Sequence, residues 1–191
     1  MLKTISCHDQ KFELRFLEPA DVEAYVAFFN GLNQESIRCR FGHLIANLTP
    51  STARPRTEGN TAEAKAIAIF ADHQDRIVAI GRCFLDATVA EAEVAIVVAE
   101  SMRRLGLGRI LLHELLAIAE REGSKTVSAY IATENAPVIK LLQSVGFKAE
   151  PANDDEDLKL ILHLHSPKIA AGLRRSDHEF RPAQPRRDWN Q

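Results

Sequence analysis

Two glycines and three arginines lie close together just after a run of apolar residues. Residues 97–109 read Val-Val-Ala-Glu-Ser-Met-Arg-Arg-Leu-Gly-Leu-Gly-Arg, which indicates a buried strand, a short loop and the start of a helix. Glycine lets the backbone come close to a ligand, and the free N–H groups at a helix start bind phosphate oxygens. Arginine side chains beside them add positive charge. The residues of this expected phosphate site are Arg103, Arg104, Gly106, Gly108 and Arg109.

A loop of this composition has other interpretations. A tight strand-to-helix turn with solvated arginines would use the same residues. The loop that holds nucleoside triphosphates needs G-x-x-x-x-G-K-[ST], which occurs nowhere in the chain. The dinucleotide-binding loop needs a third glycine, and Leu111 stands at that position. From these residues alone, the choice between a phosphate site and a plain turn stays open.

The elements that must position this loop change type along the chain. Period-2 patterns and short apolar runs predict strands, whereas apolar residues three and four apart predict helices. The expected strands are 11–17, 66–70, 77–85, 92–98, 127–131 and 158–165, with a hairpin turn at 72–75. The expected helices are 21–29, 35–41, 108–122 and 135–145. This order predicts an α/β sandwich built on one mixed, mostly antiparallel sheet flanked by helices.

Two segments carry almost no apolar pattern. Residues 47–61 predict a long loop, which is either a flexible flap over a site or a disordered segment. Residues 166–191 contain three prolines and six Lys or Arg residues against three acidic residues. Such a composition is typical of a solvated basic tail, and a partner-binding arm is the alternative. We therefore expect one domain over residues 1–165 and a flexible tail over residues 166–191.

Composition narrows the class of protein. The chain has 191 residues, of which 46% are hydrophobic, and a formal charge of −2, so nothing points to a nucleic-acid or membrane surface. It has no apolar run of about 18 residues and no signal peptide at its start. Three cysteines, Cys7, Cys39 and Cys83, show no paired spacing. We expect a cytoplasmic protein with reduced thiols.

Two motifs in the expected order resemble the GNAT acetyltransferases. Residues 103–108 match the pyrophosphate motif [QR]-x-x-G-x-[GA] of that family, which follows the family's fourth strand as it follows the fourth strand expected here. Asn135, then Leu141, then Gly146-Phe147 resemble the N-x₅-L-x₄-G-F segment of the family. The resemblance covers residues 11–165. It implies a GNAT-like fold, acetyl-CoA as co-substrate, no metal, and transfer of the acetyl group to a primary amine.

A narrower resemblance concerns the acceptor. Residues 14–21, Phe28-Phe29 and residues 36–41 are similar to the opening of bacterial protein lysine acetyltransferases that act on acyl-CoA synthetases. Residues 92–95, Ala-Glu-Val-Ala, match the A-E-[VF]-A strand of those enzymes. This resemblance implies that the acceptor is a lysine of a protein. A small-molecule amine acceptor and a non-catalytic acyl-CoA-binding module are the alternatives.

The family resemblance also implies roles for single residues. The end of the fourth strand would hold the pantetheine arm, and a bulge there would separate this strand from the next. Asn135 would hydrogen-bond the cofactor, although a role as a helix N-cap is equally compatible with its position. The implied cofactor-binding residues are Ile96, Val97, Val98, Arg103, Arg104, Leu105, Gly106, Leu107, Gly108, Arg109 and Asn135.

Glu93 is the candidate general base. An alkyl amine has a pKa of about 10 and arrives protonated at neutral pH, so it must lose a proton before it attacks a thioester. We expect the apolar strand around Glu93 to raise its pKa by desolvation and to suit it to this task. The alternative is an exposed strand residue, as we expect for Glu91.

Several further expectations concern groups that are missing. Leu142 occupies the position where many family members carry a tyrosine that protonates the leaving thiolate, and Tyr130 does not match that position. His163 and His165 share a strand face, but no third ligand accompanies them, so we expect no metal. The segments that would contact the acceptor, 28–62 and 152–157, contain no motif. The sequence indicates neither the acceptor nor the oligomeric state.

Overall fold

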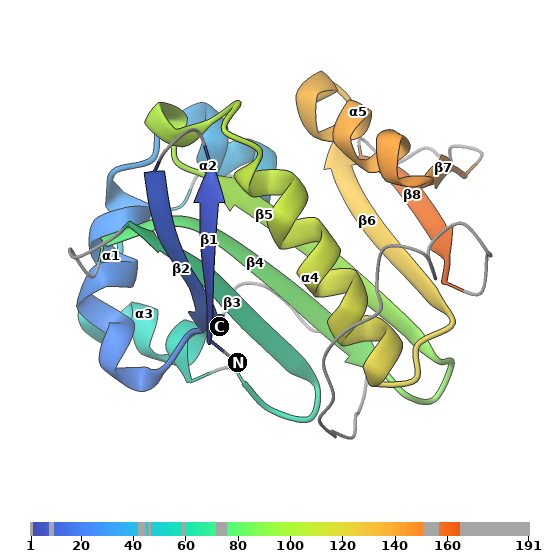
Figure 1. Ribbon diagram of the computed structural model, residues 1–191, viewed down its shortest axis with the longest axis horizontal. Coiled ribbons are helices and arrows are strands. Elements are labelled where there is room, and N and C mark those ends of the chain that lie inside the picture. The colour runs from blue at the N-terminus through green and yellow to red at the C-terminus, as the bar shows by residue number, and fades with distance from the viewer. Residues whose placement is uncertain are drawn as a thin grey trace.

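A computed structural model describes residues 2–7, 10–41, 45, 47–58, 60–71, 76–150 and 157–164. In this part of the chain, one eight-stranded sheet has helices on both faces (Figure 1). The strands lie in the order β1-β2-β3-β4-β5-β6-β8-β7. Every neighbouring pair is antiparallel except β5 and β6, which are parallel. This arrangement confirms the predicted α/β fold with one mixed, mostly antiparallel sheet.

The strands and helices have the following bounds. The strands are β1 Leu2–Cys7, β2 Gln10–Phe16, β3 Ala64–Ala71, β4 Arg76–Asp86, β5 Glu91–Val98, β6 Thr126–Ala132, β7 Lys148–Ala149 and β8 Asp157–His163. The α-helices are α1 Val22–Asn30, α2 Gln34–Phe41, α3 Pro50–Thr57, α4 Leu107–Arg121 and α5 Ala136–Val145. Two short 3₁₀ turns, Pro19–Asp21 and Glu100–Met102, precede α1 and follow β5.

The sheet separates two hydrophobic cores. Helices α4 and α5 cover one face, and α1, α2 and α3 cover the other. Strand β3 shows the division, since Ile67 and Ile69 pack toward α4 while Ala68 and Phe70 pack toward α1. Because helices cover both faces of the sheet, six consecutive residues of β3 are buried. The strand therefore lacks the alternation of polar and apolar residues that is typical of a strand with one exposed face.

Helix α4 carries the apolar stripe that fixes its place over the sheet. Leu111 and Leu115 are fully buried on it. The helix crosses the sheet directly over Gly81 of β4, where an added Cβ would lie 2.9 Å from Leu115 Cδ1. The missing side chain lets the helix sit close to the sheet, which positions its N-terminal end beside the end of β5.

The prediction of a long loop over residues 47–61 was wrong for most of that segment. Helix α3 forms within it, with Pro50 at its first position and Thr49 as its N-cap, whose hydroxyl accepts a bond from the N–H of Thr52 (3.4 Å). The helix buries Ala53 and Thr57 against its neighbours. Because the buried residues of α3 are an alanine and a threonine, the helix lacks the spacing of large apolar residues that predicts an amphipathic helix.

Other differences are small. The sequence did not predict β1 or β7, and because β1 precedes the first predicted strand, the fourth predicted strand is β5 of the structure. The last long strand ends at His163, two residues earlier than expected. The expected turn at 72–75 and the tail at 166–191 lie outside the described residues, so the domain boundary at residue 165 stays a prediction.

Candidate active site

Strands β5 and β6 separate partway along the sheet. They pair in parallel only at Glu91, Ala92 and Glu93, where Glu93 meets Ser128. Beyond this point β5 continues along β4 to Val98, while β6 continues along β8. The facing edges of β5 and β6 therefore diverge, and Figure 1 shows the gap. The register of β5 with β4 is unbroken, so the gap forms without the bulge that the family resemblance implied in this strand.

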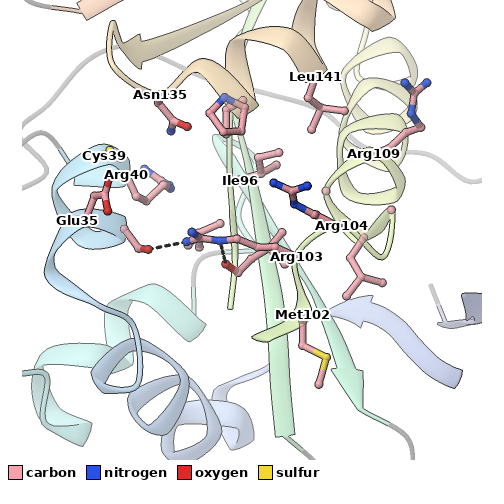
Figure 2. Close-up of a pocket in the computed structure, with 18 of the residues that line it drawn as sticks. Glu35, Cys39, Arg40, Ile96, Met102, Arg103, Arg104, Arg109, Asn135 and Leu141 are labelled. Carbon is pink, nitrogen blue, oxygen red and sulfur yellow. Dashed lines mark hydrogen bonds between the residues drawn. The ribbon is translucent and has the colours of Figure 1, made fainter. Parts of the chain in front are cut away.

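A cavity of about 590 Å³ opens beside the C-terminal half of β5. Figure 2 shows residues of α2 on one side of it and residues of the α4 end on the other. It brings together ten of the predicted site residues: Ile96, Val97, Val98, Arg103, Arg104, Gly106, Leu107, Gly108, Arg109 and Asn135. The eleventh predicted cofactor residue, Leu105, packs against the hydrophobic core instead.

The loop before α4 presents free backbone donors. Gly106 is the N-cap of α4 and has a φ of 81°, in the left-handed region that glycine tolerates. Arg104 also has a positive φ of 64°. In the described part of the chain, no backbone carbonyl accepts a bond from the N–H groups of residues 104–108. These donors lie at the positive end of the α4 dipole, which is the environment that binds phosphate oxygens.

Gly108 is required for packing as well as for access. A Cβ at this position would lie 3.3 Å from Leu141 Cδ2, and 3.7 Å from atoms of both Ile96 and Val98. The first turn of α4 therefore packs tightly against α5 and against the end of β5. Gly106 differs, because no described atom would lie within 4 Å of a Cβ added there. A Cβ at residue 106 would therefore lie in open space at the edge of the cavity.

The three arginines of the loop have different partners. Arg103 Nη2 donates to Ser36 Oγ (2.6 Å) and forms an ion pair with Glu100 (3.3 Å). Arg109 donates to Ser144 Oγ on α5 (2.9 Å). Arg104 is exposed and forms no hydrogen bond or ion pair with the rest of the described chain. Of the three, Arg104 is therefore the side chain best placed to neutralise a phosphate.

Asn135 stands at the N-cap position of α5, but its side chain makes no capping hydrogen bond. Its backbone carbonyl accepts from the N–H groups of Val138 and Ile139, at 3.1 Å each. The side-chain amide lies at the cavity (Figure 2). Of the two roles that the sequence left open, the side-chain cap is not formed, and contact with the cofactor stays a prediction.

Glu93 is half-buried and lies outside the cavity lining, on the face of the sheet that α1, α2 and α3 cover. Side chains alternate along β5, so its apolar neighbours Ala92 and Val94 point into the core on the opposite face. They cannot desolvate the carboxylate as the sequence suggested. The cross-strand partners on its own face are Phe84 and Ser128.

The face of α5 toward the cavity carries no proton donor. Its lining residues are Pro137, Val138 and Leu141. Leu142, at the position of the family's tyrosine, is 2% exposed and packs into the core. Tyr130 lies on β6 two residues beyond Ser128, on the same side of the sheet, with Lys159 Nζ 6.0 Å from its ring centroid.

Helix α2 lies in the segment 28–62 that was expected to contact the acceptor, but none of its residues was predicted as a site residue. Glu35, Ser36, Cys39 and Arg40 all line the cavity from it. Ser36 links α2 to the loop, because its hydroxyl donates to Glu100 and accepts from Arg103. Burial alone would raise the pKa of Glu100, but its hydrogen bonds and Arg103 outweigh burial and hold the pKa below its ordinary value. The signal in the sequence was only a polar helix with two arginines.

A second link joins α2 to the turn before α5. Arg38 forms an ion pair with Glu134, and both side chains are about half exposed. This contact joins α2 to the turn that follows β6. The half-buried thiol of Cys39 lies next to it, and burial raises the pKa of that thiol.

The sequence analysis also made predictions about metal sites and about membrane-spanning segments. The described residues contain no group of three or more His, Cys, Asp or Glu side chains that could hold a metal ion. His163 is exposed at the end of β8, with Nδ1 3.5 Å from Thr126 Oγ1, and residue 165 lies outside the described residues. No helix in the described part of the chain is both long enough and apolar enough to cross a membrane.

Comparisons with known proteins find similar acetyltransferases by sequence and by structure. YwnH of Bacillus subtilis (strain 168), a proposed phosphinothricin acetyltransferase, is 33% identical over 144 residues, which cover 70% of this chain and 82% of that protein. The GNAT domain of S. lividans PAT superposes with a TM-score of 0.78 at 20% identity, covering 85% of this chain and 96% of that one.

A third relative was solved with coenzyme A. RimL, a ribosomal L7/L12 alpha-N-protein acetyltransferase, superposes with a TM-score of 0.68 at 16% identity, covering 84% of this chain and 98% of that one. At these identities the two structures show the shared fold alone. The model of the acetyltransferase (GNAT) family matches residues 33–147, which include the loop, the cavity and Glu93. The chain therefore belongs to the GNAT family of acetyltransferases.

Proposed function

We propose that this protein binds acetyl-CoA in the cavity and transfers its acetyl group to a primary amine. The observation that carries the proposal is the coincidence of two features at β5. The strand separates from β6 at Glu93, and it ends at a loop whose N–H groups and Arg104 are available to phosphates. A ligand with a diphosphate at one end and a narrow arm at the other would fit both features.

Different residues of the cavity would bind different parts of acetyl-CoA. The N–H groups of residues 104–108 and the Arg104 guanidinium would hold the diphosphate. The arm would lie along Ile96, Val97 and Val98, whose outer edge has no strand partner on the β6 side. Asn135 would donate or accept one hydrogen bond from the opposite side of the gap. In this arrangement the thioester would lie near the point where β5 and β6 separate.

Glu93 lies at that point and would act as the general base. The amine nitrogen bonds to the thioester carbonyl carbon, its proton passes to the Glu93 carboxylate directly or through a water molecule, and the carbon–sulfur bond breaks. A thiol has a pKa of about 8.5, so its thiolate leaves without an obligatory acid. The apolar lining of α5 is therefore compatible with turnover.

Two acceptor classes have support. The opening segment, which includes Arg15 and Asp21, resembles protein lysine acetyltransferases and supports a lysine of a protein. The 33% identity to YwnH supports a small amine such as phosphinothricin. A module that binds acyl-CoA without turning it over is a third possibility, since the tyrosine of the family is replaced by Leu142.

One experiment separates the three. Thiol release from acetyl-CoA is followed with lysine peptides, acyl-CoA synthetases, phosphinothricin and simple amino acids as acceptors, and acetylated products are identified by mass spectrometry. We expect turnover with at least one amine. Tight CoA binding with background thiol release for every acceptor would contradict the enzymatic proposal and favour the binding module.

A further inference from the structure

Helix α2 lies against both strands that border the gap. It contacts β5 and β6, it packs on the face of the sheet where Glu93 lies, and its side chains line the cavity. The loop expected to bind phosphates lies at the start of α4, which covers the opposite face. An amine that reaches the gap from the face of Glu93 would therefore approach beside α2.

Apolar packing alone holds α2 weakly. The helix has eight residues, and of its large apolar side chains only Ile37 is buried. Phe41 at its end is partly buried and lies against Phe29, with the ring centroids 5.5 Å apart. An isolated helix of this length is not stable in water, and a helix usually gains its stability from an apolar face. The first turn of α2 therefore depends on polar contacts for its position.

A closed set of hydrogen bonds joins this first turn to the end of β5. Ser36 is 7% exposed, and its hydroxyl donates to Glu100 and accepts from Arg103 Nη2 (2.6 Å). Glu100 also accepts from the N–H of Asn33 (3.3 Å) and pairs with Arg103 (3.3 Å). Arg103 Nε donates to the carbonyl of Val98, the last residue of β5 (3.3 Å). The Arg103 guanidinium is thus the group that connects the helix to the strand.

These contacts distinguish Arg103 from Arg104. The hydrogen bonds of Glu100 and the charge of Arg103 hold the pKa of Glu100 below its ordinary value, so this carboxylate is ionised at neutral pH. Arg103 already has a counter-ion, and a turn toward a phosphate would break the ion pair and two hydrogen bonds. Arg104 would break no such contact. Figure 2 shows the Arg103 side chain extended toward α2.

We propose that Arg103 and Ser36 are positioning residues, which hold α2 beside the gap and thereby determine how the amine acceptor binds, and that Arg103 is not a ligand of the cofactor phosphates. The inference rests on the proposed function, because it concerns the acceptor of that same site. Two adjacent arginines of one motif then have different roles. Arg103 acts on the acceptor side of the cavity and Arg104 on the cofactor side.

Arg103→Met and Arg104→Met form a matched pair, since each removes one cation from neighbouring positions. With phosphinothricin or a lysine peptide as the amine, Arg103→Met should raise the KM of the amine about tenfold, the effect of one charge-assisted hydrogen bond, and leave kcat nearly unchanged. Its CoA affinity should stay within about twofold of native in about 0.15 M salt, which screens exposed charges. Arg104→Met should instead lose CoA affinity about tenfold. Equal losses of CoA affinity in calorimetry would overturn the assignment.

Ser36→Ala tests the same contact without a change of charge. It should raise the KM of the amine as Arg103→Met does. The double variant should be no worse than the weaker single variant, because both substitutions break one contact. Additive effects on KM would show that the two residues act separately and would overturn the proposal. If Arg103→Met does not fold, Ser36→Ala, which removes a single oxygen atom, carries the test.

The thiol of Cys39 reports the position of α2 without turnover. Cys39 lies on α2 at the cavity and Cys7 on the edge strand β1, and both are partly buried. In Ser36→Ala and Arg103→Met, iodoacetamide should alkylate Cys39 at least about threefold faster and Cys7 at the native rate, as peptide mass spectrometry measures. Loss of the Arg103 charge would itself slow Cys39, because that charge lowers the pKa of the thiol. A faster rate therefore reports exposure.

The two readouts separate the proposals. If Cys39 reacts faster in both variants but the native protein acetylates no amine, the positioning of α2 stands and the proposed function falls. If an amine is acetylated but Cys39 keeps its native rate in both variants, the proposed function stands and the positioning role of Arg103 and Ser36 is overturned.

Discussion

Glu93 and Ser128 form the last pair of the parallel ladder between β5 and β6. At this point the buried hydroxyl of Ser128 also donates to the carbonyl of Ala92 (3.4 Å). Beyond it the two strands diverge around the cavity. The expected base therefore lies at the narrow end of the gap, where a thioester that entered between the strands would stop.

Glu93→Gln should leave the affinity for CoA unchanged and lower turnover by about 10²–10⁴-fold, because general-base removal has costs of this size. The native rate should rise with pH through an apparent pKa that the variant lacks. Steady-state kinetics over a pH series, with calorimetry for CoA, measures both. Glu91→Gln, two residues earlier on the same strand face, is the control. Native turnover in Glu93→Gln would show that Glu93 is not the general base.

The two ends of α4 offer a matched pair of glycines. Gly106 has a φ of 81° and Gly123 a φ of 83°, and no described atom lies within 4 Å of an added Cβ at either position. Gly106→Leu and Gly123→Leu should therefore lose similar stability, about 1–2 kcal/mol. Only Gly106→Leu should lose CoA affinity, by at least about tenfold. Equal CoA affinity of the two variants in calorimetry would remove the loop from the cofactor site.

Two asparagines before helices should respond differently to truncation. Asn33 Oδ1 accepts from the N–H of Ser36 (2.7 Å) and caps α2, whereas Asn135 makes no capping bond. Asn33→Ala should lower the free energy of unfolding by about 1 kcal/mol. Asn135→Ala should leave stability nearly unchanged and weaken CoA binding about fivefold, the effect of one hydrogen bond. Chemical denaturation and calorimetry separate the outcomes, and a destabilised Asn135→Ala with native CoA affinity would contradict the assignment.

The corner between β2 and α1 depends on a paired carboxylate. Asp21 is 8% exposed and accepts two bonds from Arg15, at 2.7 Å each, and one from the N–H of Glu18. Burial alone would raise the pKa of Asp21, but these bonds outweigh it and lower the pKa below 3.8. Arg15→Met leaves the carboxylate buried without its cation, so it should cost about 2–3 kcal/mol near neutral pH.

The same pair gives a pH dependence with a definite sign. Because the pKa of Asp21 is depressed in the folded state, the stabilisation is fully present above pH 3.8 and is lost as pH falls through the folded-state value. The difference in unfolding free energy between native protein and Arg15→Met should therefore shrink below about pH 4. Arg54→Gln, which breaks an exposed pair with Glu58 at 3.9 Å, should change stability by less than about 0.5 kcal/mol at either pH. A constant difference from pH 7 to pH 3 would contradict this role of Asp21.

The parts of the site that could be predicted from the sequence are those that depend on the backbone conformation of neighbouring residues. The predicted helix 108–122 begins and ends within one residue of α4, because Gly106 and Gly123 occupy left-handed positions at its two ends. The phosphate loop could be predicted for the same reason. Its free N–H groups follow from where a strand stops and a helix starts, and these are properties of neighbouring residues.

Only the tertiary structure decided which side chains meet at the site. Ser36 and Arg40 join the loop and the cavity across more than 60 residues of sequence, and no local pattern encodes such a contact. The environment of Glu93 depends on Phe84 and Ser128 from neighbouring strands, since its own neighbours in sequence face the other way. The gap itself exists because the ladder between β5 and β6 stops at Glu93 and Ser128, although both strands run on beyond these residues. Which strands pair, and where a ladder stops, depends on contacts between segments that are distant in sequence, so the sequence pattern of one strand does not predict it.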